Sequence, residues 1–190
     1  VDAMLFLAGE NSRLGRVDDG TSLMDYEIEE IERKATISSS LACFEWNKHK
    51  INLLDTPGND NFIYDAKLCM RVLDGAVVVV SAVSGVGVQT EKVWEYAEEF
   101  GVPRAVFVNK MDRERADFAR TIEDLQKTFT DKTFVVIQIP IGKEDTFRGV
   151  VDLLAMKAYV YKDDQSGAFE KVDIPADLAA EASKHREKLI

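Results

Sequence analysis

Apolar and polar positions follow two different periods along this chain, and the two periods predict strands and helices. Short apolar or alternating runs bounded by turn residues predict strands at 38–46, 50–55, 75–82, 104–109 and 134–139. Apolar residues recur every three to four positions and predict helices at 1–8, 62–74, 89–100, 114–129 and 175–190. Because strand and helix alternate with short links, the pattern predicts a doubly wound, mostly parallel α/β sheet.

Three segments of the chain allow more specific structural predictions. The tight connection at 47–49 predicts that the strands on either side of it pair as an antiparallel hairpin. The continuous apolar run at 75–82 is typical of a strand buried on both faces of a parallel sheet. The acidic segment 25–33 places Ile28 and Ile31 on one helical face, and most of its charged side chains are expected to be solvated, on a helix or a mobile loop.

The rhythm of the chain changes at residue 140, where a polar, turn-rich link interrupts the alternation. We therefore predict a larger α/β domain over 1–139 and a smaller inserted subdomain over 140–190, with the fold incomplete at both ends of the chain. A loop is predicted at 162–167.

The first chemical motif, Asp55-Thr56-Pro57-Gly58, follows a predicted strand. Ligands of open α/β sheets bind beyond the carboxyl ends of the strands. A carboxylate there can hold Mg²⁺ through water, and the N–H of a glycine can closely approach a terminal phosphate. A strand end followed by a plain turn is the alternative interpretation of this motif.

The second motif, Asn109-Lys110-Met111-Asp112, follows the strand predicted at 104–109. The Asp112 carboxylate can accept hydrogen bonds from N1–H and the 2-amino group of guanine, a pair of donors that adenine lacks. The stem of Lys110 can cover the base, and Asn109 can bridge its edge to neighbouring loops. A solvated polar loop is the alternative, but the two motifs together predict a guanine-nucleotide domain.

Composition and charge limit the kinds of partner that we expect this protein to bind. Hydrophobic residues make up 46% and charged residues 31%, as in ordinary globular proteins, and the net charge is −10. This charge argues against a broad basic surface for DNA, although a local contact with RNA remains open. Cys43 and Cys69 have no metal-binding spacing and are expected to be buried free thiols in a reducing compartment. No membrane span is expected, and the expected location is cytoplasmic.

Several segments together resemble bacterial elongation factor G, a translational GTPase. The segments that carry this resemblance are Met24-Asp25, Glu32-Arg33-Lys34-Ala35-Thr36-Ile37, Asp55-Thr56-Pro57-Gly58, Met70-Arg71-Val72-Leu73-Asp74-Gly75-Ala76 and Asn109-Lys110-Met111-Asp112. Ile141-Gly142-Lys143-Glu144-Asp145-Thr146-Phe147 and Met156-Lys157-Ala158-Tyr159 resemble the insert that elongation factor G carries in its GTPase domain. The resemblance covers nearly the whole chain.

The resemblance implies a phosphate-sensing switch that binds GTP or GDP with Mg²⁺. Thr36 is similar to the switch threonine whose hydroxyl joins Mg²⁺ and whose backbone senses the γ-phosphate. Asp55 would bind the same ion through water, Gly58 would donate its N–H to the γ-phosphate, and 62–74 would form the second switch helix. Asn109, Lys110 and Asp112 would bind the guanine base.

Three features depart from the family pattern. The phosphate-binding loop Gly-x-x-x-x-Gly-Lys-[Ser/Thr] occurs nowhere in the 190 residues, so we expect a fragment of a longer protein that is inactive by itself. Asn59 stands where the family usually has a His that helps orient the attacking water, which makes Asn59 the candidate catalytic residue and slow hydrolysis the expectation. Lys34-Ala35 replaces the usual Gly-Ile. The last two changes indicate a divergent paralogue.

The leading interpretation is therefore the GTP-hydrolysing domain of an elongation factor G-like protein that acts on the ribosome. A GTP-binding regulatory module with weak or no hydrolysis is the second interpretation. Another translational GTPase, such as a release factor or a ribosomal protection protein, fits the residues of the insert less well.

Overall fold

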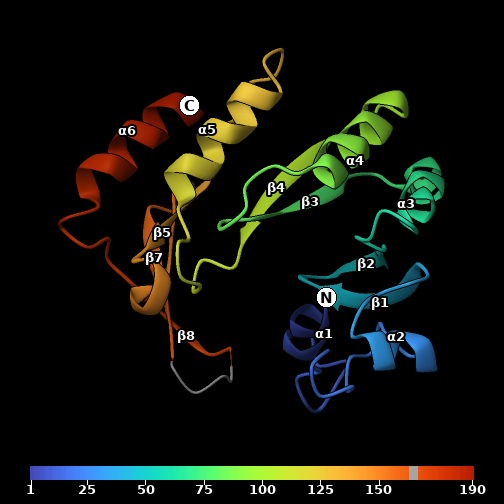
Figure 1. Cartoon of the computed structure of the whole chain (residues 1–190). Helices are drawn as coiled ribbons and strands as arrows, with labels where there is room; N and C mark the ends of the chain where they lie inside the picture. Colours follow the sequence, from blue (N-terminus) through green and yellow to red (C-terminus); the bar gives the residue numbers. More distant parts are fainter. Residues whose placement is uncertain (163–166) are drawn as a thin grey trace. The chain divides into compact units, whose positions relative to one another are not determined.

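The computed structural model describes residues 1–162 and 167–190, so most of the loop predicted at 162–167 lies outside the described residues (Figure 1). The elements are α1 Asp2–Leu7, α2 Ile28–Arg33, β1 Ser40–Trp46, β2 His49–Asp55, α3 Ile63–Cys69, η1 Met70–Val72, β3 Ala76–Ser81, α4 Val88–Glu99, β4 Arg104–Asn109, α5 Phe118–Thr128, β5 Gln138–Ile141, η2 Glu144–Thr146, β6 Gly149–Asp152, β7 Lys157–Tyr161, β8 Phe169–Val172 and α6 Ala179–Leu189. They form two compact units, Val1–Val78 with Val88–Ala105, and Val79–Gly87 with Val106–Ile190.

The hairpin predicted in the first unit is confirmed. β1 and β2 pair antiparallel from Ser40 opposite Asp55 to Trp46 opposite His49. Asn47 and Lys48 connect them with positive φ angles of 48° and 65°, which suits the right-handed twist of a two-residue hairpin turn.

The side chains of this hairpin alternate between two faces. Phe44 is buried with Leu5 and Met24, whereas Cys43 points to the opposite face and is exposed. The prediction that Cys43 is a buried thiol is therefore wrong, because one strand cannot turn neighbouring side chains to the same face. Cys69 is only partly buried, and both thiols are free.

β3 and β4 run parallel and pass from the first unit into the second. The N–H of Ala76 donates to Pro103 O at 2.9 Å, and the N–H of Ala82 donates to Asn109 O at 2.8 Å, so their partners advance in the same direction. Val78 and Val80 are buried, but Val77 and Val79 are 63% and 59% exposed. The expected burial of this strand on both faces is therefore wrong for the described residues.

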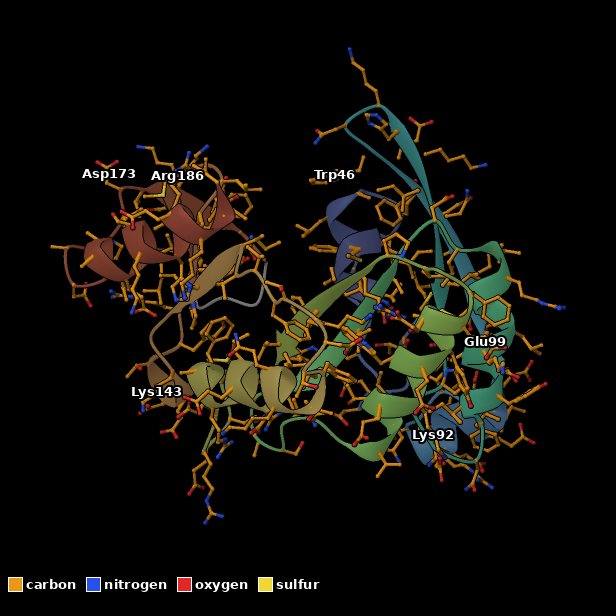
Figure 2. The ribbon with its side chains drawn as sticks, turned by 90° about the horizontal axis from the view of Figure 1, so that it is seen from above. Trp46, Lys92, Glu99, Lys143, Asp173 and Arg186 are labelled. Atoms are coloured by element: carbon orange, nitrogen blue, oxygen red, sulfur yellow. The ribbon has the colours of Figure 1, made fainter. Side chains whose placement is uncertain are left out.

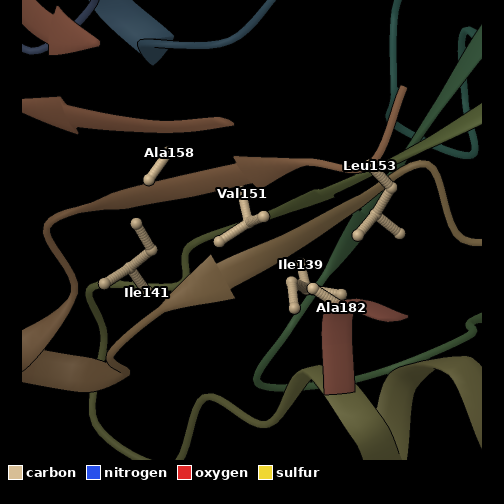
Figure 3. Packing of buried hydrophobic residues seen from close by; sticks show 6 residues of the cluster. All are labelled: Ile139, Ile141, Val151, Leu153, Ala158 and Ala182. Carbon is tan, nitrogen blue, oxygen red and sulfur yellow. The ribbon is translucent and has the colours of Figure 1, made fainter. Parts of the chain in front are cut away.

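The second unit contains a four-stranded antiparallel sheet in the order β5-β6-β7-β8. Its core is shown in Figure 3 and is formed by Ile139, Ile141, Val151, Leu153, Ala158 and Ala182. The strand predicted at 134–139 instead begins at Gln138 and includes Pro140. Proline is tolerated because β5 is an edge strand, where a lost N–H donor breaks no ladder.

The pairing of the described strands differs from the predicted sheet. Only β3 and β4 are parallel among the described pairs, so the mostly parallel arrangement is not confirmed. The helix predicted at 114–129 begins at Phe118, because the Asp117 carboxylate accepts the N–H of Arg120 at 2.9 Å and caps the helix there. No helix in the described part of the chain is long and apolar enough to cross a membrane.

Candidate functional site

Asp55 lies at the last position of β2, where the sequence predicted a ligand-facing carboxylate. Burial raises the pKa of this carboxyl above its ordinary value, and the nearby carboxylates of Asp25 and Asp2 raise it further. The hydrogen bond from the N–H of Thr56 acts in the opposite direction. The first unit therefore gathers acidic groups around Asp55 in a partly desolvated setting.

Thr36 is held by one of these acidic residues. Its Oγ1 donates a hydrogen bond to Asp25 Oδ1 at 2.8 Å, and Asp25 is only 5% exposed. Asp25 is therefore an exception to the expectation that most charges of 25–33 are solvated. Sequence reasoning had singled out Thr36 but had assigned no role to the carboxylate that its hydroxyl contacts.

Glu30 is the second buried acid that sequence reasoning missed. Its side chain accepts the N–H of Ile37 at 2.9 Å, that of Ser38 at 3.1 Å and that of Glu27 at 3.2 Å, and it is 1% exposed. Ile28, which the spacing places on one helical face with Ile31, is 70% exposed. The signal in the sequence was the spacing Glu27-x-x-Glu30, in which an acid three residues after the helix cap returns to the backbone.

Burial by itself would raise the pKa of Glu30, but hydrogen bonds from the backbone N–H groups of Ile37, Ser38, Glu27 and Tyr26 outweigh it and hold the pKa below its ordinary value. A carboxyl with a lowered folded pKa stabilises the fold above the ordinary carboxyl range. That stabilisation is lost as the pH falls through the lowered value. Glu30 therefore fixes the segment after Thr36 at neutral pH.

Glu30→Ala is expected to lower the free energy of local opening at Ile37 and Ser38 by roughly 2–3 kcal/mol, because two N–H groups lose a charged acceptor. Amide hydrogen exchange in the full-length protein measures this at neutral pH, and the difference from the wild type should shrink as the pH falls through the folded pKa of Glu30. Glu29→Ala, on the exposed side of the same helix, is the control and should change little. Unchanged protection at Ile37 and Ser38 in Glu30→Ala would contradict the role of this carboxylate.

The loop after Asp55 is closed by hydrogen bonds to the side chain and the backbone carbonyl of Asn59. Asn59 Oδ1 accepts the N–H of Asn61 at 3.0 Å, and Asn59 O accepts the N–H of Phe62 at 3.0 Å. Gly58 has no positive φ, and a Cβ placed on it would meet nothing within 4 Å. Within the described structure, neither the backbone conformation nor packing requires glycine at this position.

Two ion pairs connect the segment after this loop to α4. Asp60 lies 2.5 Å from Lys92 Nζ, and Lys67 Nζ lies 2.7 Å from Glu99. Lys92 and Glu99 are labelled on α4 in Figure 2. Both pairs are partly exposed, so each contributes little to stability.

The residues predicted to read the base lie in the second unit, where β4 ends. Asn109, Lys110 and Asp112 are exposed, whereas Met111 between them is buried against Ala82 and Ala116. Asn109 Oδ1 accepts the N–H of Lys110 at 2.8 Å, and Lys110 has a left-handed φ of 62°. The buried methionine thus anchors a loop that presents its three polar side chains to solvent.

The structure therefore places the predicted site residues in two groups. Thr36, Asp55, Gly58 and Asn59 belong to the first unit, and the loop Asn109–Asp112 belongs to the second.

The donor atoms of the first group suit Mg²⁺. In the described residues, no three or more His, Cys, Asp and Glu side chains gather to hold a metal ion alone. Mg²⁺ is usually bound by one or two carboxylates together with water and phosphate oxygens, so an all-protein cage is not required. The carboxylate of Asp55 and the hydroxyl of Thr36 are hard oxygen donors of the right kind, and the neighbouring acids that raise the pKa of Asp55 favour a cation there.

Comparison with known proteins identifies the family to which this chain belongs. The sequence profile described as the elongation factor Tu GTP binding domain matches residues 1–182. The structure is also similar to the crystal structure of a protein from Thermus thermophilus, with a TM-score of 0.90 and 31% sequence identity. That match covers 99% of this chain and 28% of the other, so the chain spans less than a third of the protein it resembles. The chain belongs to the elongation factor Tu GTP-binding domain family and is a translational GTPase domain with the α/β fold of P-loop GTPases.

Proposed function

We propose that this chain is the GTP-binding and GTP-hydrolysing domain of a bacterial elongation factor G-like translation factor that acts on the ribosome in the cytoplasm. The observation that carries the proposal is the loop Asn109–Asp112. Within a domain of the translational GTPase family, this loop buries Met111 and exposes the three side chains that guanine recognition requires.

In this proposal the exposed loop reads the base. Asp112 accepts hydrogen bonds from N1–H and the 2-amino group, Lys110 lies along the face of the base, and Asn109 links the base edge to the loop. A site built around such hydrogen bonds rejects a base that lacks the donors, because its own polar groups are then left unpaired.

The first unit senses the phosphates. Gly58 donates its N–H to the γ-phosphate, and the open space around it is consistent with close approach of a ligand. Thr36 and Asp55 hold Mg²⁺, which when bound would neutralise the negative charge of the phosphates. The Thr36 hydroxyl donates a hydrogen bond to Asp25 and keeps its oxygen lone pairs for a metal ion, so the contact with Asp25 orients the hydroxyl without blocking coordination.

The organisation of the longer protein follows from the same interpretation. We propose that residues 1–139 are part of its GTP-binding domain and that 140–190 are part of an elongation factor G-type insert. The small share of the Thermus protein that this chain covers supports a longer protein. Lys34-Ala35 and Asn59 make it a divergent paralogue. Lys34 adopts φ 53° at the end of α2, a left-handed conformation that the Gly usual in the family would adopt without strain.

A second function is favoured by a specific contact. Asn59 Oδ1 is already bonded to the N–H of Asn61, so the side chain is turned into its own loop. A group held in this way is poorly placed to orient a water, which is what a GTP-binding regulatory module with weak or no hydrolysis would show.

The experiment uses the full-length protein that carries this sequence. Calorimetry should find tight binding of GDP and GTP and no binding of ADP or ATP. Single-turnover hydrolysis with and without ribosomes then separates the two functions, because an elongation factor is stimulated by ribosomes and a binding module is not. Equal affinity for ATP and GTP would overturn both proposals.

A further inference from the structure

The segment Gly142–Phe147, expected from the sequence only as part of an insert, forms a hydrogen-bonded turn between β5 and β6. Gly142 has a φ of 78°, and a Cβ there would lie 2.1 Å from Thr146 O, so only glycine fits. The Thr146 hydroxyl donates to Lys143 O at 2.6 Å and accepts the N–H of Lys143 at 3.1 Å. Lys143 is labelled in Figure 2.

This turn contacts the loop Asn109–Asp112 through Glu144, in the same compact unit. The N–H of Glu144 donates to Met111 O at 2.8 Å, and its Oε1 accepts the N–H of Arg115 at 2.8 Å. Phe147 adds an apolar contact with the cluster that contains Met111.

The two hydrogen bonds of Glu144 flank Asp112 on both sides along the chain. Asp112 itself is exposed, and its described partner is Arg113, in an ion pair at 3.8 Å that is solvent-exposed and holds it weakly. The two hydrogen bonds of Glu144 therefore fix the backbone on either side of Asp112. The exposed ion pair with Arg113 holds the Asp112 carboxylate less firmly.

The backbone conformation around this contact is unusual. Glu144, Arg115 and Lys110 have φ angles of 52°, 65° and 62°, which residues with a Cβ seldom adopt. Three such residues in and beside the loop Asn109–Asp112 indicate that surrounding contacts, and not local preference, determine the shape of the loop.

We propose that Glu144 is a positioning residue for guanine recognition, which sets the place of Asp112 by holding Met111 O and the N–H of Arg115. This rests on the proposed role of Asp112. It assigns to the turn Gly142–Phe147 a part in base selectivity, through the backbone N–H and the side chain of one residue, Glu144.

The test compares Glu144→Ala with Glu144→Gln in the full-length protein. Glutamine keeps an oxygen that can accept the N–H of Arg115, and alanine does not. GDP and IDP are the probes, because hypoxanthine keeps N1–H but lacks the 2-amino group that Asp112 accepts. Asp145→Ala, exposed in the same turn, is the matched control.

Glu144→Ala is expected to weaken GDP binding roughly tenfold and to lower the ratio of GDP to IDP affinity, whereas Glu144→Gln and Asp145→Ala keep the wild-type ratio. If the role of Glu144 is purely structural, Glu144→Ala will lower the melting temperature and weaken the binding of GDP and IDP equally. That result would overturn the inference. An unchanged ratio in Glu144→Ala, or an equal loss in Glu144→Gln, would do the same. If the wild type itself does not distinguish GDP from IDP, the role of Asp112 fails first, and the inference fails with it.

Discussion

Asp112→Asn in the full-length protein is expected to move its base preference from guanine to xanthine. The asparagine amide donates where the carboxylate accepted, so it meets the 2-oxo group of xanthine and opposes the 2-amino group of guanine. We expect GDP affinity to fall on the order of 10³-fold or more, and XDP affinity to rise. Competition calorimetry with GDP and XDP measures both.

The structure supplies a matched control for this exchange. Glu114, two residues further along, is also an exposed acid, and its only described ion pair is with Arg115 at 3.9 Å. Glu114→Gln removes the same charge and should leave the ratio of GDP to XDP unchanged. A general effect of charge would lower GDP affinity in both variants and would contradict the assignment of Asp112.

The hairpin and the position of Asp55 could be predicted because their signals are local. Alternation with period two gives the strands, and a two-residue turn at Asn47-Lys48 leaves one register in which Phe44 is buried. The end of β2 is then fixed, and Asp55 with it. Asn109 follows from the end of β4 by the same reasoning.

Glu30 could not be predicted from hydrophobicity, because its burial depends on donors that lie outside its helix. Ile37 and Ser38 supply N–H groups from the segment that follows, and these offset the cost of removing a carboxylate from water. The apolar pattern places Ile28 and Ile31 on one helical face, but both side chains are exposed. Buried acids of this kind are identified by hydrogen-bond accounting and not by hydropathy.

The role of the turn Gly142–Phe147 was also outside the reach of the sequence. Its contacts join residues about 30 positions apart, Glu144 with Met111 and Arg115, and no local periodicity encodes them. The sequence predicted only a polar, turn-rich link in this region. Only the structure shows that the backbone N–H and the side chain of Glu144 contact Met111 and Arg115, in and beside the loop Asn109–Asp112.

The position of the Asn59 side chain bears on the rate of GTP hydrolysis. In phosphoryl transfer of this kind the protein contributes mainly positioning and electrostatics, so one misplaced side chain can limit the rate. The oxygen of Asn59 is occupied by the N–H of Asn61, which turns the amide back into the loop. Asparagine is also shorter than histidine and cannot carry a positive charge.

Asn59→His is therefore expected to raise GTP hydrolysis on ribosomes at least about tenfold, because positioning or proton transfer by one side chain is typically worth about 10²–10⁴-fold. The full-length wild type should hydrolyse GTP slowly in the same single-turnover assay, with GTP affinity equal in both proteins. Asn61→Ala serves as the control, since it alters a neighbouring exposed side chain but keeps the backbone N–H that Asn59 accepts. A wild type that already matches an ordinary elongation factor G, or a substitution that leaves the rate unchanged, would show that Asn59 does not limit the reaction.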